Sequence, residues 1–190
     1  MSDAPISTKN MIEKPARPRV AWGRMLVWGG LLALLVVVAF GLIRTQQGPV
    51  NKGQQAPAFT LTTFDDQQIN SADLRGKVVL INFWASWCKP CESEAADLEA
   101  AWRYYQPRGD VVFLGVDYAD TPGQALAYLK KFDITYPNGP DLGTRISQAF
   151  RIRGVPETFV VAPNGEITLQ KIGPFISLAE IKAAIDPLLP

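Results

Sequence analysis

A chain of 190 residues, 47% of them hydrophobic, is long enough for one domain of ordinary size and a further segment. Its 19 Lys and Arg residues balance 18 Asp and Glu residues, so the sequence lacks the basic excess typical of nucleic-acid binding. It has two cysteines and no histidine, which excludes Ser-His-Asp and Cys-His catalysis as well as histidine ligation of haem.

The first predicted element is a transmembrane helix over residues 25–43, "MLVWGGLLALLVVVAFGLI". These 19 residues carry no charge, and about 20 apolar residues span the hydrocarbon core of a bilayer. Basic residues outnumber acidic ones before this run, so the positive-inside rule places the N-terminal tail, residues 1–24, in the cytoplasm. We therefore expect a single-pass protein of the cytoplasmic membrane. A linker over residues 44–55 would lead to a folded domain, residues 56–190, on the outer or periplasmic side.

A cleaved signal peptide is the alternative interpretation of this run. The apolar region of a signal peptide has about 7–15 residues and ends in a small-residue cleavage site. The run here is longer, and "AFG" at Ala39–Gly41 resembles such a site only weakly. These features favour an uncleaved anchor.

The folded domain is predicted to alternate strands and helices. A hairpin turns at Asp65–Asp66, and the apolar run Lys77–Trp84 is typical of a central strand covered on both faces. The later elements, in chain order, are a helix that follows the cysteines and ends at Pro107, a strand over Asp110–Asp117, a helix over Thr121–Phe132, a shorter helix over Leu142–Phe150, the strands "TFVVA" and "EITLQKI", and a helix beginning at Ser177. This order predicts an α/β domain in which helices cover both faces of a mixed sheet.

Cys88 and Cys91, the only cysteines of the chain, form a Cys-X-X-Cys pair between the central strand and the next helix. A disulfide that closes so small a loop stabilises a fold little. A structural zinc site needs four ligands, and the chain has no third cysteine and no histidine, so we expect no metal and no cofactor. Reversible thiol–disulfide chemistry is the role that remains.

Two segments of the chain resemble the thioredoxin family. "FWASWCKPC" is similar to the thioredoxin active site, and "RIRGVPETFVVAPNGEI" (Arg151–Ile167) is similar to the segment that carries the cis-proline of that family. The N-terminal hairpin, the extra helix between Asp117 and Pro137 and the membrane anchor resemble the TlpA, ResA and CcmG (DsbE) group. Its members are exported thiol–disulfide reductases that serve cytochrome c maturation and related tasks. The resemblance covers Gln55 to Pro190 and implies a thioredoxin fold.

The resemblance implies a catalytic role for both cysteines. Cys88 is expected at the start of the helix, where backbone N–H groups and the helix dipole favour its thiolate, and it would attack a client disulfide. Cys91, one turn later, would resolve the mixed disulfide. Pro156 is expected to be cis and to face the pair, with the backbone of Val155 available to pair with an extended client segment.

Glu94 follows Cys91 by three residues and therefore lies on the same helix face. In ResA-like proteins an acid at this position takes part in proton transfer with the cysteines, which implies a catalytic role for Glu94. The alternative is an acid that only interacts with the helix dipole, as Glu92 would. The chain departs from the pattern at Ala96, where the group often has proline. It also has Asn82 where thioredoxin has its buried acid, so any carboxylate that assists Cys91 must be Glu94.

Three further residues are candidates for client binding. Trp84 and Trp87 flank the cysteines, and they either shape a docking surface or pack as ordinary apolar side chains. Glu157 follows the predicted cis-proline, as in the CcmG branch. It either adds a polar group to the site or pairs with Arg151 or Arg153.

The expected function is reduction of disulfides in exported client proteins. One such client is apocytochrome c, whose haem-binding cysteines must be reduced before haem attaches; a copper-site dithiol of an oxidase is another. The sequence "CKPC" does not by itself fix the direction of electron transfer. The resemblance implies an integral-membrane thiol transporter as the electron donor.

Two other functions are compatible with a thioredoxin-like domain. One is a non-catalytic binding module, which would retain its function after Cys88→Ala. The other is a peroxiredoxin-like peroxidase, whose reactive cysteine follows a Thr or Ser by three residues. The chain has Ala85 at that position, which disfavours the peroxidase.

Overall fold

The computed structural model describes residues 22–45 and 50–190, and the chain divides into two compact units between Gln47 and Gly48. Most of the predicted tail, and residues 46–49 of the predicted linker, lie outside the described residues.

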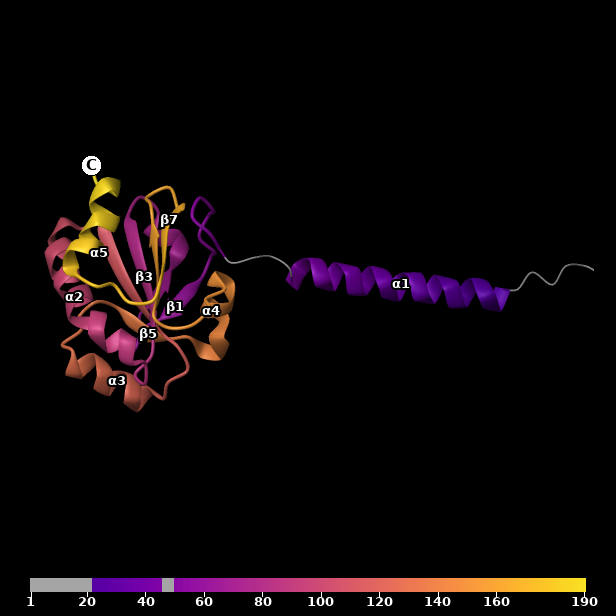
Figure 1. The fold of residues 1–190 in the computed structure, drawn as a ribbon, viewed down its shortest axis with the longest axis horizontal. Helices are drawn as coiled ribbons and strands as arrows, with labels where there is room; N and C mark the ends of the chain where they lie inside the picture. Colours follow the sequence, from indigo (N-terminus) through magenta and orange to yellow (C-terminus); the bar gives the residue numbers. More distant parts are fainter. Residues whose placement is uncertain (1–21, 46–49) are drawn as a thin grey trace, which may run out of the picture. The chain divides into compact units, whose positions relative to one another are not determined.

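The first unit contains one helix, α1 (Trp22–Thr45), among its described residues (Figure 1). This helix includes the whole predicted anchor, residues 25–43, and every side chain described between residues 25 and 41 is exposed. Within the described part of the chain, no helix is long and apolar enough to cross a membrane.

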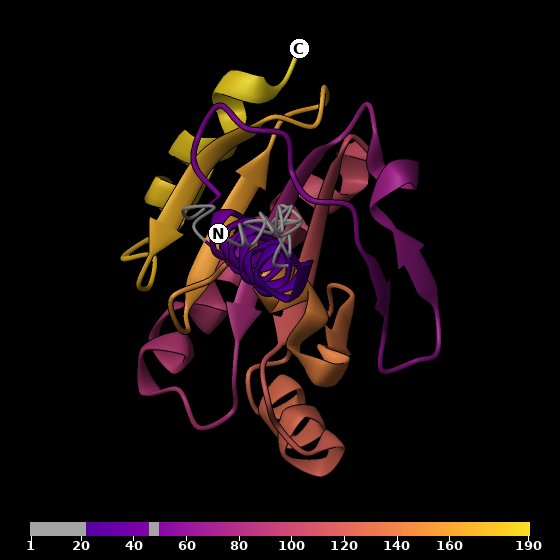
Figure 2. The ribbon, with the colours of Figure 1, turned by 90° about the vertical axis from the view of Figure 1, so that its right-hand side faces the viewer.

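The second unit is built on a five-stranded mixed sheet in the order β5–β4–β3–β6–β7 (Figure 2). β3 pairs in parallel with β4 and antiparallel with β6, and all its residues are buried, as the predicted central strand requires. The strands are β3 (Val78–Trp84), β4 (Val111–Asp117), β5 (Asn138–Pro140), β6 (Glu157–Val161) and β7 (Ile167–Ile172).

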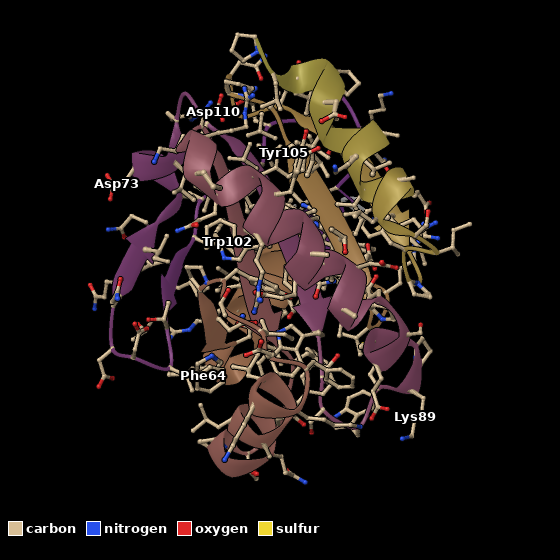
Figure 3. All side chains as sticks on the ribbon, turned by 90° about the vertical axis from the view of Figure 1, so that its left-hand side faces the viewer. Phe64, Asp73, Lys89, Trp102, Tyr105 and Asp110 are labelled. Atoms are coloured by element: carbon tan, nitrogen blue, oxygen red, sulfur yellow. A yellow bond between two sulfur atoms is a disulfide. The ribbon has the colours of Figure 1, made fainter. Side chains whose placement is uncertain are left out.

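Helices cover both faces of this sheet, as predicted (Figure 1). Alternate residues of β3 point to opposite faces, so Val79 and Ile81 belong to one core whereas Val78 and Leu80 belong to the other. The first core is closed by α4 (Arg145–Phe150) and by the hairpin of β1 (Thr60–Thr62) and β2 (Gln68–Asn70). The second is closed by α2 (Lys89–Tyr105) and α5 (Leu178–Ile185), which lie together across the sheet (Figure 3).

A third, smaller core lies where β3 ends and α2 begins. Trp84 and Ala85 pack there with both cysteines, with Ala95 of α2, and with Ala125 and Tyr128 of α3 (Pro122–Lys131). The disulfide is therefore part of a packed cluster that joins the sheet to two helices.

Three elements differ from the predictions in detail. The helix after the cysteines ends at Tyr105, and Pro107 lies in a 3₁₀ turn that follows it. The predicted helix Leu142–Phe150 is instead a 3₁₀ turn, Leu142–Thr144, followed by α4, because the left-handed backbone angles of Gly143 and Thr144 interrupt a continuous α-helix. β5 has no counterpart among the predicted elements, since three residues that include a glycine and a proline carry no strand pattern.

Candidate active site

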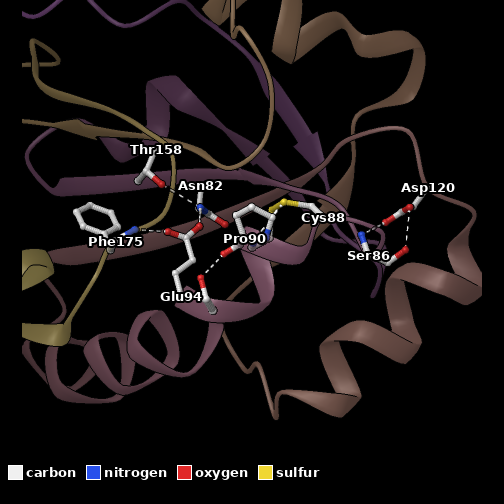
Figure 4. The surroundings of a disulfide bond; sticks show 10 residues. Asn82, Ser86, Cys88, Pro90, Glu94, Asp120, Thr158 and Phe175 are labelled. Carbon is white, nitrogen blue, oxygen red and sulfur yellow. Dashed lines mark hydrogen bonds between the residues drawn. A yellow bond between two sulfur atoms is a disulfide. The ribbon is translucent and has the colours of Figure 1, made fainter.

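The two cysteines form a disulfide at the junction between β3 and α2 (Figure 4). Cys88 is the N-cap residue of α2, and its sulfur accepts a hydrogen bond from the backbone N–H of Cys91 at 3.1 Å. Pro90 lies in the first turn, where its missing N–H removes no helical hydrogen bond. In the reduced protein, the same N–H group and the helix dipole favour a thiolate at Cys88.

The two tryptophans beside the disulfide have different environments. Trp84 is 2% exposed; its indole Nε1–H donates to Asn138 Oδ1 at 2.8 Å, and its ring stacks on Tyr128 at 4.4 Å between centroids. Trp87 is 59% exposed. The side chain of Trp84 therefore packs in the third core, whereas Trp87 offers its ring to the surface beside Cys88.

Glu94 is a buried carboxyl group, 1% exposed, one helical turn after Cys91. Its Oε2 accepts the backbone N–H of Phe175 at 2.7 Å, and its Oε1 accepts the side-chain amide of Asn82 at 2.9 Å. Burial raises the pKa of Glu94 from its ordinary 4.5 to about 7, against the lowering effects of these two hydrogen bonds and of the Lys171 charge. A carboxyl group with this pKa can gain and lose a proton near neutral pH.

The Glu94 site depends on the register of the sheet. Asn82 of β3 lies opposite Thr158 of β6, and its amide donates to Thr158 Oγ1 as well as to Glu94. The side-chain amide of Asn82 therefore makes one hydrogen bond within the sheet, to Thr158, and one to the Glu94 carboxylate of α2. Asn82 cannot ionise, but it binds the group that can.

Glu92 shows what a surface acid in the same helix looks like. Its carboxylate pairs with Lys89 at 3.3 Å and with Lys131 of α3 at 3.2 Å, and hydrogen bonds to these lysines lower its pKa. Unlike Glu94, Glu92 makes its contacts at the protein surface.

The Val155–Pro156 peptide bond is cis, as predicted. Pro156 is buried at the start of β6, and Val155 packs against the core that contains both cysteines. The segment that carries the cis-proline therefore contacts the cysteine cluster, although more than sixty residues separate them in the chain.

Glu157 is buried but points away from the cysteine side of the sheet. It lies opposite Phe83 of β3, which belongs to the first core, whereas its neighbour Thr158 shares a face with Asn82. Its carboxylate accepts the backbone N–H of Arg153 at 2.8 Å and the side-chain amide of Gln170 at 2.7 Å. Strand alternation therefore places Glu157 and Glu94 on opposite faces.

Two groups near the cysteines have no counterpart among the predicted site residues. Asp120 accepts the backbone N–H of Ser86 at 2.5 Å and its hydroxyl at 2.9 Å, which fixes the loop before Cys88. Asp117, at the end of β4, is buried, and burial together with Asp120 raises its pKa to about 8. The two acids of "VDYAD", Asp117 and Asp120, at the end of a buried strand are the signal that could have identified them.

Phe175 is the third residue that sequence reasoning missed. Its backbone N–H, not its side chain, contacts Glu94, and 81 residues separate the two. Backbone groups leave no mark in the sequence, so no residue pattern could predict this contact.

Together these groups can carry out reversible two-electron exchange. A capped cysteine supplies the nucleophile, a second cysteine one turn later closes the disulfide, and a buried carboxyl group with a near-neutral pKa lies on the same helix.

Comparisons with known proteins identify the same chemistry. The AhpC/TSA family model matches residues 52–170. The chain is 36% identical over 170 residues to the thiol:disulfide interchange protein HelX of Rhodobacter capsulatus, covering 83% of this chain and 93% of HelX. It is 30% identical over 146 residues to the thiol–disulfide oxidoreductase ResA of Bacillus cereus, covering 75% of this chain and 84% of ResA.

A solved structure supports the fold. The crystal structure of a thiol:disulfide interchange protein of the thioredoxin family from Chlorobium tepidum has a TM-score of 0.66 and 28% identity. The similarity covers 74% of this chain and 99% of that protein. The predicted thioredoxin fold is confirmed. The chain thus belongs to the AhpC/TSA family and is a thiol–disulfide oxidoreductase of the kind represented by ResA and HelX.

Proposed function

We propose that this protein is a reductase, in which the Cys88–Cys91 dithiol donates two electrons to disulfides of client proteins. The Cys88 thiolate attacks one client sulfur, which forms a mixed disulfide and releases a client thiolate. Cys91 then gives up its proton and attacks Cys88, which re-forms the intramolecular disulfide and releases the second client thiolate. The client gains two electrons, and its two thiolates take up protons from the site and from water.

The observation that carries this proposal is the buried Glu94 carboxyl group on the Cys91 face of α2. A base with a pKa of about 7 can take the proton of Cys91 when that thiol must become a nucleophile. It can return the proton when the disulfide is reduced again. Glu94 therefore serves the resolving cysteine, whereas the helix N-terminus serves Cys88.

The reductive direction is supported by chemistry and by resemblance. A compartment outside the cytoplasm is already oxidising. A further oxidant there gains little from a dedicated anchored protein, whereas thiols that must stay reduced need one. The TlpA, ResA and CcmG group, which the sequence resembles, acts in this direction.

We propose apocytochrome c as the client class and an integral-membrane thiol transporter as the reductant. Haem attaches to two cysteine thiols of apocytochrome c, and a disulfide between them prevents attachment. An extended client segment can pair with the backbone of Val155 beside the cis-proline, with Trp87 exposed nearby. Neither mode of contact requires a folded client, which suits an apoprotein.

We also propose that the protein is anchored in the cytoplasmic membrane with its catalytic domain outside. The uncharged run over residues 25–43 supports this location, because its 19 residues are about the number that spans the hydrocarbon core of a bilayer. The excess of Lys and Arg before the run supports a cytoplasmic N-terminus.

The reduction potential of the full-length protein tests the direction of electron transfer. We expect a value near that of thioredoxin, about −270 mV, and far from that of the oxidant DsbA, about −120 mV. Equilibration with glutathione or dithiothreitol buffers, followed by alkylation of free thiols, gives the potential. A value above about −150 mV contradicts a reductase.

Trapping of mixed disulfides tests the client class. In Cys91→Ser, Cys88 can attack but nothing resolves the adduct, so covalent complexes should accumulate in cells, and mass spectrometry should identify cytochrome c peptides in them. Cys88→Ser is the matched control and should trap none. Complexes that lack c-type cytochromes would overturn the proposed client, and trapping by Cys88→Ser would reverse the two cysteine roles.

A further inference from the structure

Glu180 connects three parts of the chain beside Glu94. It lies in the first turn of α5; its Oε1 binds Lys171 Nζ of β7 at 2.5 Å, and its Oε2 accepts the backbone N–H of Ile176 at 2.9 Å. Ile176 belongs to the segment 173–177, which joins β7 to α5. Glu180 therefore fixes this connection by two contacts: an ion pair with Lys171 of the preceding strand β7, and a hydrogen bond with Ile176 inside the connection.

The residue before Ile176 makes the contact that matters for the active site. Phe175 donates its backbone N–H to Glu94 Oε2 at 2.7 Å, while its buried ring packs in the second core, with Lys171 Nζ 5.7 Å from the ring centroid. Two consecutive N–H groups in one short connection thus bind two carboxylates, one on α5 and one on α2 (Figure 4 shows the second). Because these N–H groups belong to consecutive residues, a change in the contact between Ile176 and Glu180 should also move the Phe175 N–H relative to Glu94.

We propose that Glu180 is a positioning residue for the thiol–disulfide reaction: by fixing the segment 173–177, it aims the Phe175 N–H at the Glu94 carboxylate. This inference rests on the proposed role of Glu94 for its effect on the cysteines. Its geometry can be tested without that role.

Several charged or titratable groups face Glu94, and they decide what each substitution should do. Lys171 of β7 lowers the pKa of Glu94 through its charge, and Glu180 of α5 raises it. Tyr128 of α3 and Tyr136 before β5 also interact electrostatically with Glu94, and the cysteine pair of its own helix titrates only after the disulfide is reduced. Loss of the Glu180 charge alone should lower the pKa of Glu94, whereas loss of the Phe175 hydrogen bond should raise it.

Glu180→Ala and Glu180→Gln separate these two effects. Alanine removes both the charge and the acceptor for Ile176 N–H, whereas glutamine removes the charge but retains an acceptor oxygen. If Glu180 positions the segment, alanine should raise the pKa of Glu94 by about one unit, because the charged carboxylate loses a hydrogen bond. Glutamine, which keeps the acceptor and loses only the charge, should leave the Glu94 pKa at or slightly below the wild-type value. ¹³C NMR of the carboxyl groups of the full-length oxidised protein measures this, with Glu94 assigned by its loss in Glu94→Gln.

Ser177→Ala is the control for a purely structural role. Ser177 Oγ caps α5 by accepting the N–H of Glu180 at 3.3 Å, and its loss weakens the helix start while leaving the two Glu180 carboxylate contacts in place. We expect lower stability and an unchanged Glu94 pKa. The proposal is overturned if Glu180→Ala leaves the Glu94 pKa unchanged, if both Glu180 variants lower it, or if Ser177→Ala raises it equally.

Thiol reactivity distinguishes failure of this inference from failure of the proposed function. In the reduced protein, a raised pKa keeps Glu94 neutral over a wider pH range, so the pH profile of cysteine alkylation should shift to lower pH in Glu180→Ala, in the same direction as in Glu94→Gln. If Glu94→Gln leaves the alkylation profile unchanged, Glu94 has no role in the reaction. The NMR result then still decides whether Glu180 positions the Phe175 N–H.

Discussion

Glu94 combines nearly complete burial with two hydrogen-bond partners among the described residues, and this balance sets its chemistry. Burial disfavours the charged carboxylate. The Phe175 N–H, the Asn82 amide and the Lys171 charge favour it, but their combined effect is smaller than that of burial. The pKa of Glu94 therefore rises to about 7. A carboxylate with better partners would stay ionised and could not return a proton. One with none would stay protonated and could not accept one.

Glu94→Gln should change cysteine titration without unfolding the protein. Glutamine keeps the size of the side chain and an acceptor for Phe175 N–H, but it removes a negative charge and a titrating group beside Cys91. Thiolates should therefore form at lower pH than in the wild type, and alkylation of the reduced protein should accelerate most at and above about pH 7, where wild-type Glu94 is ionised. Identical alkylation profiles for both proteins would leave Glu94 as an acid that only interacts with the helix dipole.

The same substitution has a stability signature whose sign follows from the raised pKa. Between pH 4.5 and about 7 the folded protein binds a proton at Glu94 that the unfolded chain has lost, so the free energy of unfolding falls as pH rises through this window. The fall is at most about 3 kcal/mol. Glu94→Gln should remove this contribution. Asp117, raised to about 8, contributes a fall of the same sign in both proteins, so the difference between them isolates Glu94.

At the scale of elements, the sequence predicts those whose residues carry their own signal. β3 is a continuous apolar run, α2 has apolar residues at helical spacing, and α5 begins directly after Ser177, where a helix is predicted to begin. β5 lacks such a signal because it forms through its partners: it pairs with β4, and the carbonyl oxygen of Asn138 accepts the N–H of Phe64 beside the hairpin at 2.8 Å. The sheet face of Glu157 likewise depends on pairing with β3.

Gly115 explains how β4 and β5 pack around Trp84. A Cβ at Gly115 would lie 1.6 Å from Asn138 Oδ1 and 2.9 Å from Trp84 Nε1, which are hydrogen-bonded to each other. Gly115→Ala should displace Asn138, leave the buried indole N–H unpaired and lower the free energy of unfolding by about 2 kcal/mol or more. Gly123→Ala is the matched control in α3, where a Cβ meets nothing within 4 Å. It should be neutral or stabilising by less than about 1 kcal/mol. Equal effects in denaturant unfolding would contradict this account.

At the scale of the whole molecule, the candidate site assembles from segments that are distant in the chain. The end of β3, the first turns of α2, the cis-proline segment and the segment 173–177 converge around the cysteines and Glu94. The sequence predicts the first three because each carries a local motif. It cannot predict the fourth, since the contact of segment 173–177 uses a backbone N–H and depends on how α5 docks beside α2.

The membrane location can be tested in the full-length chain. We expect the protein to remain in the membrane fraction after an alkaline wash and a reporter fused after Pro190 to be exported, because the run over residues 25–43 is uncharged and follows a basic segment. Leu34→Arg combined with Leu35→Arg places two charges at the centre of the run, each costing about 3 kcal/mol of insertion, and should release the protein from the membrane. The control, Asn51→Arg with Gln54→Arg, adds the same charge at exposed positions of the second unit and should leave the location unchanged. A freely soluble mature protein that begins near Leu42 would instead identify the run as a cleaved signal peptide.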